Sequence, residues 1–211
     1  MTAAQVLLHA GCCSLPTDLG KIAAAHDIKL ISYESCAATY DMDIAEIYRS
    51  IGHMGFSFRD EQHYICAVNE KACGRMRRRW TTAHELAHVL LGHISEQILP
   101  LHKEAEQAAD RFAAEMLAPM CVLHFCGVSS AEEIARLTGL SKQASEIRMK
   151  ELSALRRAHS EQMRLAAREG TDLRNTETFL PDGNARMLLE QYLPFIAEYI
   201  TRASEIKKQF S

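Results

Sequence analysis

The chain has 211 residues, of which 47% are hydrophobic and 24% are charged, a composition that excludes a largely disordered protein. The net charge of −3 argues against a protein whose whole surface binds nucleic acid or anionic membranes. Seven cysteines, an odd number, favour reduced thiols over a disulfide framework. No stretch approaches the roughly 18 apolar residues of a membrane span, and residues 1–8 do not resemble a signal peptide. We therefore expect a cytoplasmic protein.

The first third of the chain mixes helical and strand patterns. Its first helix is expected to have Thr17 as its N-cap. Short runs rich in β-branched and aromatic residues predict strands, two of them in a hairpin. In chain order we expect a helix over 15–25, a strand over 28–33, a helix over 43–51 and hairpin strands over 55–59 and 63–69.

Two strong helical patterns follow the hairpin. They predict helices over 74–91 and 101–117, the second ended by Pro119. The order of elements favours an α+β fold, in which helices cover a small mixed or antiparallel sheet. We assign residues 1–127 to this domain.

The remaining residues, 128–211, are expected to form a helical region. Residues 128–158 have the proportions of a helix-turn-helix. A polar loop over 170–184 is followed by a C-terminal helix over 184–209. That last helix would have to be amphipathic and either dock on the rest of the chain or pair with a partner.

The most specific chemical signal is the sequence HELAH, from His84 to His88. Four residues make slightly more than one helical turn, so both imidazoles project from one face of the helix. Both can then reach one Zn²⁺ at about 2.0–2.1 Å. Glu85 lies beside the metal and can accept a proton from water, which is the general-base role in a metalloprotease.

A catalytic zinc takes three protein ligands and keeps one position open. The next predicted helix offers Glu106 and Asp110, again four residues apart. Glu106 is our candidate third ligand, and Asp110 could accept the free ring N–H of a ligating histidine. Glu104 is a rival third ligand on the other side of the same helix. His93 is a second rival, although its spacing from the motif differs from that of the metzincins.

Two blocks of sequence resemble the ImmA/IrrE family of metallo-endopeptidases. The first is RRWTTAHELAHVLLGH, residues 78–93. The second is EQAADRFAAEMLAP, residues 106–119, which is similar to the family signature E-x-x-A-N/D-x-F-A-A-x-L-L-x-P. The likeness covers roughly residues 16–155. It implies a zincin-like arrangement of the two long helices in the domain over residues 1–127. It also implies a gluzincin-like site holding one zinc ion, with Glu85 as the catalyst and, as ligands, His84, His88 and Glu106.

Members of this family typically relieve repression by cleaving helix-turn-helix repressors of mobile elements or stress regulons. The resemblance therefore implies a zinc-dependent endopeptidase of narrow range whose partner is such a repressor. The alternative is a non-catalytic, metal-stabilised regulator that binds a repressor partner or DNA. The intact Glu85 favours the enzyme, because a purely structural metal site needs no base and is usually closed by a fourth protein ligand.

A second hydrogen-bond donor should stabilise the oxyanion that forms during peptide hydrolysis. The sequence leaves four candidates open: Tyr40, Tyr64, His93 and His102. The predicted hairpin could also present a strand edge that holds the substrate in an extended form.

Two basic segments remain. The run over residues 75–79 contains four arginines and would suit an acidic substrate segment or a DNA backbone, but a solvated helix start is the simpler interpretation. The helix-turn-helix could contact DNA directly through four polar side chains, although the net charge favours a packing or docking role. These side chains are Lys142, Gln143, Arg148 and Lys150.

Overall fold

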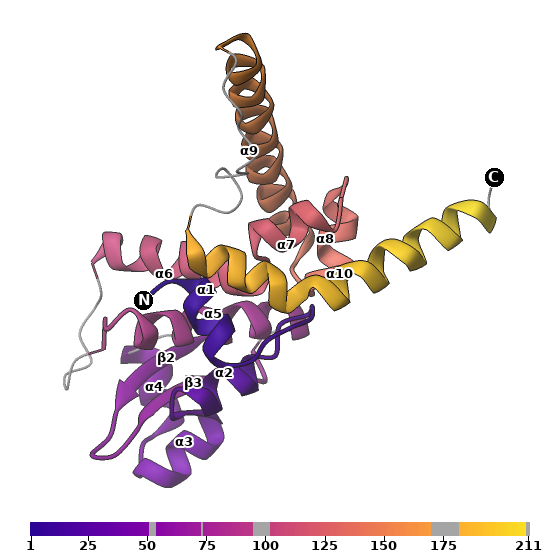
Figure 1. Ribbon diagram of the computed structural model, residues 1–211. Coiled ribbons are helices and arrows are strands. Elements are labelled where there is room, and N and C mark those ends of the chain that lie inside the picture. Colours follow the sequence, from indigo (N-terminus) through magenta and orange to yellow (C-terminus); the bar gives the residue numbers. More distant parts are fainter. Residues whose placement is uncertain (51–53, 73, 95–101, 170–181, 210–211) are drawn as a thin grey trace. The chain divides into compact units, whose positions relative to one another are not determined.

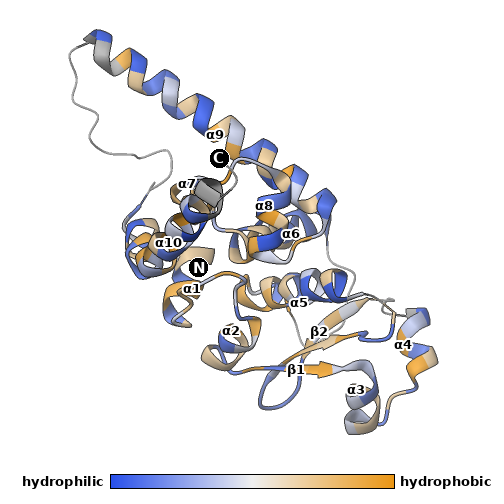
Figure 2. Cartoon of the chain, turned by 90° about the vertical axis from the view of Figure 1, so that its right-hand side faces the viewer, coloured by the Kyte–Doolittle hydropathy of each residue, from blue (hydrophilic) through white to orange (hydrophobic). Residues whose placement is uncertain are grey.

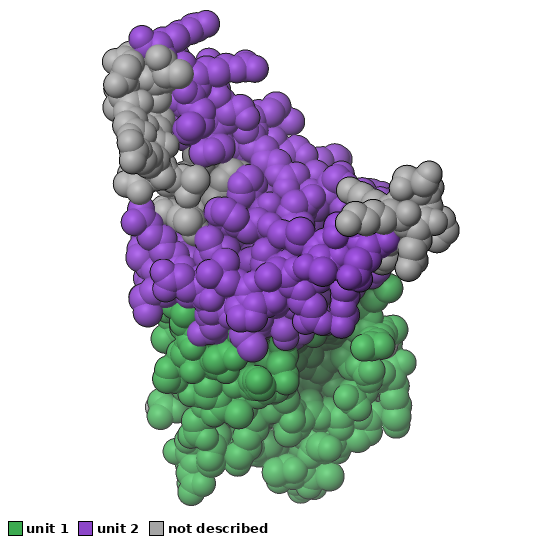
Figure 3. Space-filling view, turned by 45° about the vertical axis from the view of Figure 1, so that its right-hand side comes forward, with its two compact units in different colours: residues 1–12, 18–117 green, residues 13–17, 118–211 purple. Residues whose placement is uncertain are grey.

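The protein is described here by a computed structural model (Figure 1). The residues that it describes are 1–50, 54–72, 74–94, 102–169 and 182–209. They divide into two compact units (Figure 3), which we treat separately. The first unit comprises residues 1–12 and 18–117, and the second comprises residues 13–17 and 118–211. The domain boundary at residue 127 stays a prediction. No helix within the described ranges has the length and apolar character needed to cross a membrane.

The first unit is built around a three-stranded mixed sheet. Its strands are β1 (Ile28–Ser32), β2 (Gly55–Arg59) and β3 (Tyr64–Val68). β3 lies in the centre, parallel to β1 and antiparallel to β2. Among the described strands β2 pairs with β3 alone, so its outer edge has backbone groups that another chain could pair with. This sheet, with its covering helices, confirms the α+β fold expected from the sequence.

Helices cover both faces of the sheet (Figures 1 and 2). α5 packs against β2 and β3 on one face, and α6 packs along α5. α3 contacts β1 and β3 on the opposite face. The helices of this unit are α1 (Ala3–His9), α2 (Leu19–Ala25), α3 (Tyr33–Tyr40), α4 (Ile44–Ser50), α5 (Arg75–Leu90) and α6 (Lys103–Leu117).

Alternation along β2 and β3 decides which side chains meet α5. Phe56 and Ala67 are buried in an apolar cluster with residues of α3 and α4. Their neighbours Ser57 and Cys66, which are paired across the ladder, must point to the other face because side chains alternate along a strand. A hydroxyl and a thiol therefore lie under α5.

The start of α2 differs from the prediction. Thr17 is fully buried and is not the N-cap. Asp18 takes that position, and its Oδ1 accepts the backbone N–H groups of Gly20 and Lys21 at 2.9 and 3.1 Å. Both residue types cap helices well. The cap is therefore the residue whose side chain is not buried by packing and can accept hydrogen bonds from the first turn of the helix.

Two short helices were not expected from the sequence. α1 and α3 have seven and eight residues, too few for a clear helical period. α3 also follows β1 without a loop, since Ser32 ends the strand and accepts the backbone N–H of Ser35 at 3.1 Å as the cap of the helix. A continuous run of this kind gives no turn signal that would separate strand from helix.

The second unit is entirely helical in its described part. α8 packs against α9, and the turn between them contains Gly139 with a φ of 72°. This left-handed conformation ends α8 and favours glycine. α9 runs to Glu169, well beyond residue 158, where the expected helix-turn-helix ends, and its far half extends past α7 and α8 (Figure 1). The helices are α7 (Met120–Phe125), α8 (Ala131–Thr138), α9 (Lys142–Glu169) and α10 (Gly183–Gln209).

The C-terminal helix α10 is amphipathic and packs on α7. Its buried residues recur every three or four positions, as expected for one helical face. They are Ala185, Leu188, Tyr192 and Ile196. The polar loop expected before this helix lies, for residues 170–181, outside the described residues.

Arg148 does not fit the role of a DNA-reading side chain. Only 7% of it is exposed, and its Nε and Nη2 donate to the carbonyl oxygen of Ala118 at 2.9 and 2.7 Å. Its Nη1 donates to Glu151 at 2.9 Å. Arg148 therefore holds α9 to the chain ahead of α7, and the expectation that it could contact DNA is wrong.

Candidate metal centre

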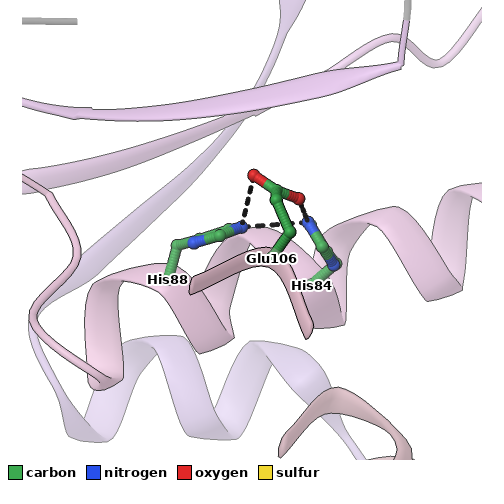
Figure 4. Close-up of side chains that lie close together, drawn as sticks. All are labelled: His84, His88 and Glu106. Atoms are coloured by element: carbon green, nitrogen blue, oxygen red, sulfur yellow. Dashed lines mark hydrogen bonds and ion pairs between the residues drawn. The ribbon is translucent and has the colours of Figure 1, made fainter. Parts of the chain in front are cut away.

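α5 brings the two histidines of the HELAH sequence onto one face. Ala83 and Leu86 are fully buried and fix the rotation of the helix, so that His84 and His88 face α6. Their Nε2 atoms lie 2.9 Å apart, and His88 is 2% exposed. Figure 4 shows the two rings pointing toward the same space above the helix.

Glu106 on α6 completes the group (Figure 4). Its Oε2 lies 3.2 Å from His84 Nε2, and its Oε1 lies 3.6 Å from His88 Nε2. Ligand atoms around a tetrahedral zinc at 2.0–2.1 Å are separated by about 3.3 Å, so these three atoms have the spacing that such an ion requires. Two imidazoles and a carboxylate are also the donor types of catalytic zinc.

The other expected acidic ligand does not join the group. Glu104 is exposed at the start of α6, while the ligand atoms of His84, His88 and Glu106 all lie within 4.8 Å of one another. Since positions 104 and 106 are about 200° apart on a helix, only one of them can face α5.

The outer nitrogen of each histidine also has a partner. Asp110 Oδ1 lies 2.9 Å from His84 Nδ1, and His93 Nδ1 lies 3.1 Å from His88 Nδ1. Burial, followed by the neighbouring His84 and His93, lowers the pKa of His88 to about 4. His88 is therefore neutral at pH 7, which is the form that binds a metal. Partners of this kind fix the orientation and tautomer of a ligating imidazole.

Glu85 is held on the sheet side of α5. It is 8% exposed, and its Oε2 accepts a hydrogen bond of 2.7 Å from the Ser57 hydroxyl on β2. Burial raises the pKa of Glu85 above its usual value, while the Ser57 hydrogen bond and nearby His84 partly offset that effect. The result is a buried carboxyl next to the three convergent ligand atoms, as a general base requires.

The close approach of β2 to α5 depends on Gly55. A Cβ atom at that position would lie 2.5 Å from Thr81 Cγ2 and 3.1 Å from Glu85 Cγ. Only a residue without a side chain fits there. Gly55 and Ser57 were not singled out in the sequence, and the one signal they gave was the alternation of the predicted strand.

The remaining predicted residues lie in other surroundings. The Tyr40 hydroxyl donates to Asp60 Oδ2 at 2.8 Å, and the Tyr64 ring lies 5.4 Å from the Arg59 guanidinium carbon. The carbonyl of His102 accepts backbone N–H groups at the start of α6. None of these described contacts reaches the metal-binding group, whereas His93 contacts His88 directly.

Comparison with known families agrees with this geometry. The sequence model of a peptidase family, described as the IrrE N-terminal-like domain, matches residues 41–150, just over half of the chain. The chain belongs to this family. The match spans α5 and α6, and it confirms the resemblance to the ImmA/IrrE proteins. The family is one of metallopeptidases, so the function is of the metallopeptidase type. No curated protein matches the chain significantly.

Proposed function

We propose that this IrrE-like protein is a zinc-dependent metallo-endopeptidase of the cytoplasm. The observation that carries the proposal is the convergence of His84, His88 and Glu106 beside the buried carboxyl of Glu85. A structural zinc site would normally contain a fourth protein ligand, and the described metal-binding group has three. A carboxyl next to such a group has the position of a general base.

In this proposal each residue has a defined task. His84 and His88 would bind the ion through Nε2, and Glu106 would bind it through its carboxylate. The zinc ion would polarise the substrate carbonyl and make water acidic enough to lose a proton near neutral pH. Glu85 accepts that proton on its carboxylate, and the remaining hydroxide adds to the carbonyl carbon of the substrate. Glu85 then passes the proton to the amine, which leaves when the C–N bond breaks. Asp110 and His93 keep the two imidazoles in the tautomer that leaves Nε2 unprotonated.

We propose that the substrate backbone binds along the outer edge of β2. β2 lies beside α5, with Ser57 in contact with Glu85, so a strand added at this edge passes close to the metal-binding group. Main-chain hydrogen bonds would hold the substrate in an extended form whatever its sequence. Selectivity must then come from side-chain contacts on either side of the cleaved bond.

The proposed substrate is a helix-turn-helix repressor, as in the family that this chain resembles. Cleavage would relieve repression of a mobile element or a stress response. The competing proposal is a regulator that binds the repressor, or DNA, without cutting. Burial of Arg148 removes one of the basic side chains that direct DNA contact would have used.

The test combines metal content with cleavage. Purified protein is incubated with the repressor encoded beside its gene, with and without a chelator, and Glu85→Gln is assayed in parallel. We expect about one zinc per chain in both proteins, chelator-sensitive cleavage by the native protein, and a rate at least 10²-fold lower for Glu85→Gln. Tight binding of an uncut repressor by the zinc-loaded native protein would favour the regulator, and unchanged cleavage by Glu85→Gln would show that Glu85 is not the base.

A further inference from the structure

The first turn of α5 has an unusual concentration of positive charge. Arg75, Arg77, Arg78 and Arg79 lie within five residues at the N-terminal end of the helix. The helix dipole makes this the unfavourable end for cations. Gly74, the N-cap, provides no side-chain hydrogen bond there either. Helix stability therefore does not account for the arginines.

Two of the four arginines have acidic neighbours. Arg78 forms an ion pair with Glu70 at 3.7 Å. Arg79 is half-buried; burial and the like charge of Arg75 lower the pKa of Arg79, and Asp18 opposes that shift. These two side chains are accounted for by contacts within the first unit.

Arg75 and Arg77 are different. Both are exposed, and neither takes part in an ion pair or side-chain hydrogen bond found among the described residues. The proximity of Arg75 to Arg79 shows that the positive charge is concentrated rather than dispersed. An exposed guanidinium attracts an anionic group. Positions 75 and 77 are about 200° apart on a helix, so the two side chains project from opposite sides of α5.

The position of Arg77 relates it to the metal-binding group. It lies seven residues before His84, which is two helical turns, so both side chains project from nearly the same face of α5. The distance along the helix axis is about 10 Å. Arg77 thus continues the line of His88 and His84 toward the N-terminal end of the helix.

β2 runs alongside α5. Gly55 lies against Thr81 and Ser57 lies against Glu85, so the strand and the helix advance side by side in the same direction. A chain paired with the outer edge of β2 advances about 3.3 Å per residue. Starting from a carbonyl near His84, it comes level with Arg77 about three residues away.

We propose that Arg77 binds an acidic side chain of the protein substrate about three residues from the cleaved peptide bond. This specificity subsite rests on the proposed peptidase function. A guanidinium group binds a carboxylate through two parallel hydrogen bonds, which gives directional selectivity for Asp and Glu. Because the whole chain has a net charge of −3, attraction of an acidic peptide must come from a local patch.

Binding is tested separately from cleavage. The protein is the zinc-loaded, full-length Glu85→Gln variant, and the probes are a fluorescein-labelled dodecapeptide with three glutamates, its glutamine counterpart, and a DNA duplex of equal charge. We expect at least tenfold tighter binding of the glutamate peptide than of the glutamine peptide. Arg77→Gln should abolish this difference. The matched control is Lys21→Gln, which removes the same charge from an exposed position of the same unit and should change affinity less than twofold.

A charge-reversing variant provides a further test of the subsite. Arg77→Glu should bind a lysine dodecapeptide more tightly than the glutamate one. Equal loss of affinity in Arg77→Gln and Lys21→Gln, or tighter Arg77-dependent binding of the DNA duplex, would overturn the acidic subsite.

Cleavage of a mixed peptide library separates this proposal from the peptidase function itself. Products from the native protein should be enriched in Asp or Glu two to four residues from the cut, and Arg77→Gln should lose that enrichment. If the native protein binds the acidic peptide through Arg77 but cuts nothing, the peptidase function fails and the acidic site stands. If it cuts and Arg77→Gln leaves the cleavage profile unchanged, the subsite fails and the peptidase function stands.

Discussion

The Ser57 hydroxyl on β2 donates a hydrogen bond of 2.7 Å to Oε2 of Glu85 on α5. This contact ties the edge strand to the proposed catalytic base. The same hydroxyl lies 3.5 Å from the Cys66 sulfur, and burial raises the pKa of the Cys66 thiol to about 12, so this thiol stays protonated. The carboxylate of Glu85 is thus oriented by a neutral hydroxyl, which in turn contacts a neutral thiol.

Removing that hydroxyl should lower activity without releasing the metal. Ser57→Ala leaves a buried carboxylate with one hydrogen bond fewer, and a hydrogen bond to a charged group contributes about 1.5–3 kcal/mol. We expect kcat/KM for repressor cleavage to fall about tenfold or more, with zinc content unchanged. The control is Ser35→Ala, which removes a hydroxyl on α3, far from Glu85 in sequence. Equal activities of the two variants would rule out a positioning role for Ser57.

The partners of the two histidines proposed as ligands should set zinc affinity. Asp110→Ala removes the acceptor 2.9 Å from His84 Nδ1, and we expect zinc to bind about 10–100-fold more weakly. His93→Ala should act in the same way through His88, since their Nδ1 atoms are 3.1 Å apart. Competition with a chromophoric chelator measures both constants.

Glu104→Ala is the matched control for this prediction. It removes an exposed carboxylate from the same helix and should leave zinc affinity unchanged. A large loss of affinity in Glu104→Ala, together with native affinity in Asp110→Ala, would show that the zinc site uses the other side of α6.

The packing of β2 on α5 can be tested at a single atom. In Gly55→Ala the added methyl group would lie 2.5 Å from Thr81 Cγ2, so the strand, the helix or both must move. Overpacking of this kind costs about 1–3 kcal/mol of folding free energy. We expect a lower Tm and reduced cleavage. Gly183→Ala, where an added Cβ has no neighbour within 4 Å, should not lower the Tm.

The second unit should lose stability in mild acid because of His124. Burial, and then the nearby Arg156 and His159, lowers the pKa of His124 to about 4. An unfolded histidine titrates near 6.5, so the fold favours the neutral ring. This stabilisation is complete above about pH 6.5 and is lost as the pH falls toward 4.

Thermal unfolding between pH 7.5 and 4.5 measures the effect. His124→Gln cannot take up a proton, so its Tm should decline less over this range than that of the native protein. Parallel decline of the two proteins would show that groups other than His124 control the acid sensitivity.

The sequence by itself determined the features that depend on local periodicity. The spacing of His84 and His88 places them on one helical face, because the geometry of a single α-helix is the same in any fold. Short runs rich in β-branched and aromatic residues likewise predicted β2 and β3, and the two blocks around the proposed metal ligands were sufficient to indicate the family. These patterns involve residues that lie within a few positions of one another.

Only the tertiary structure decided the contacts between segments distant in the chain. Glu106 lies 18 residues beyond His88, and the packing of α6 along α5 selects it over Glu104. Ser57 reaches Glu85 only because the sheet lies under α5, and Arg148 is buried by its bonds to Ala118. Such contacts arise from the way in which elements pack, and periodicity along one element does not specify the rotation or register of its neighbour.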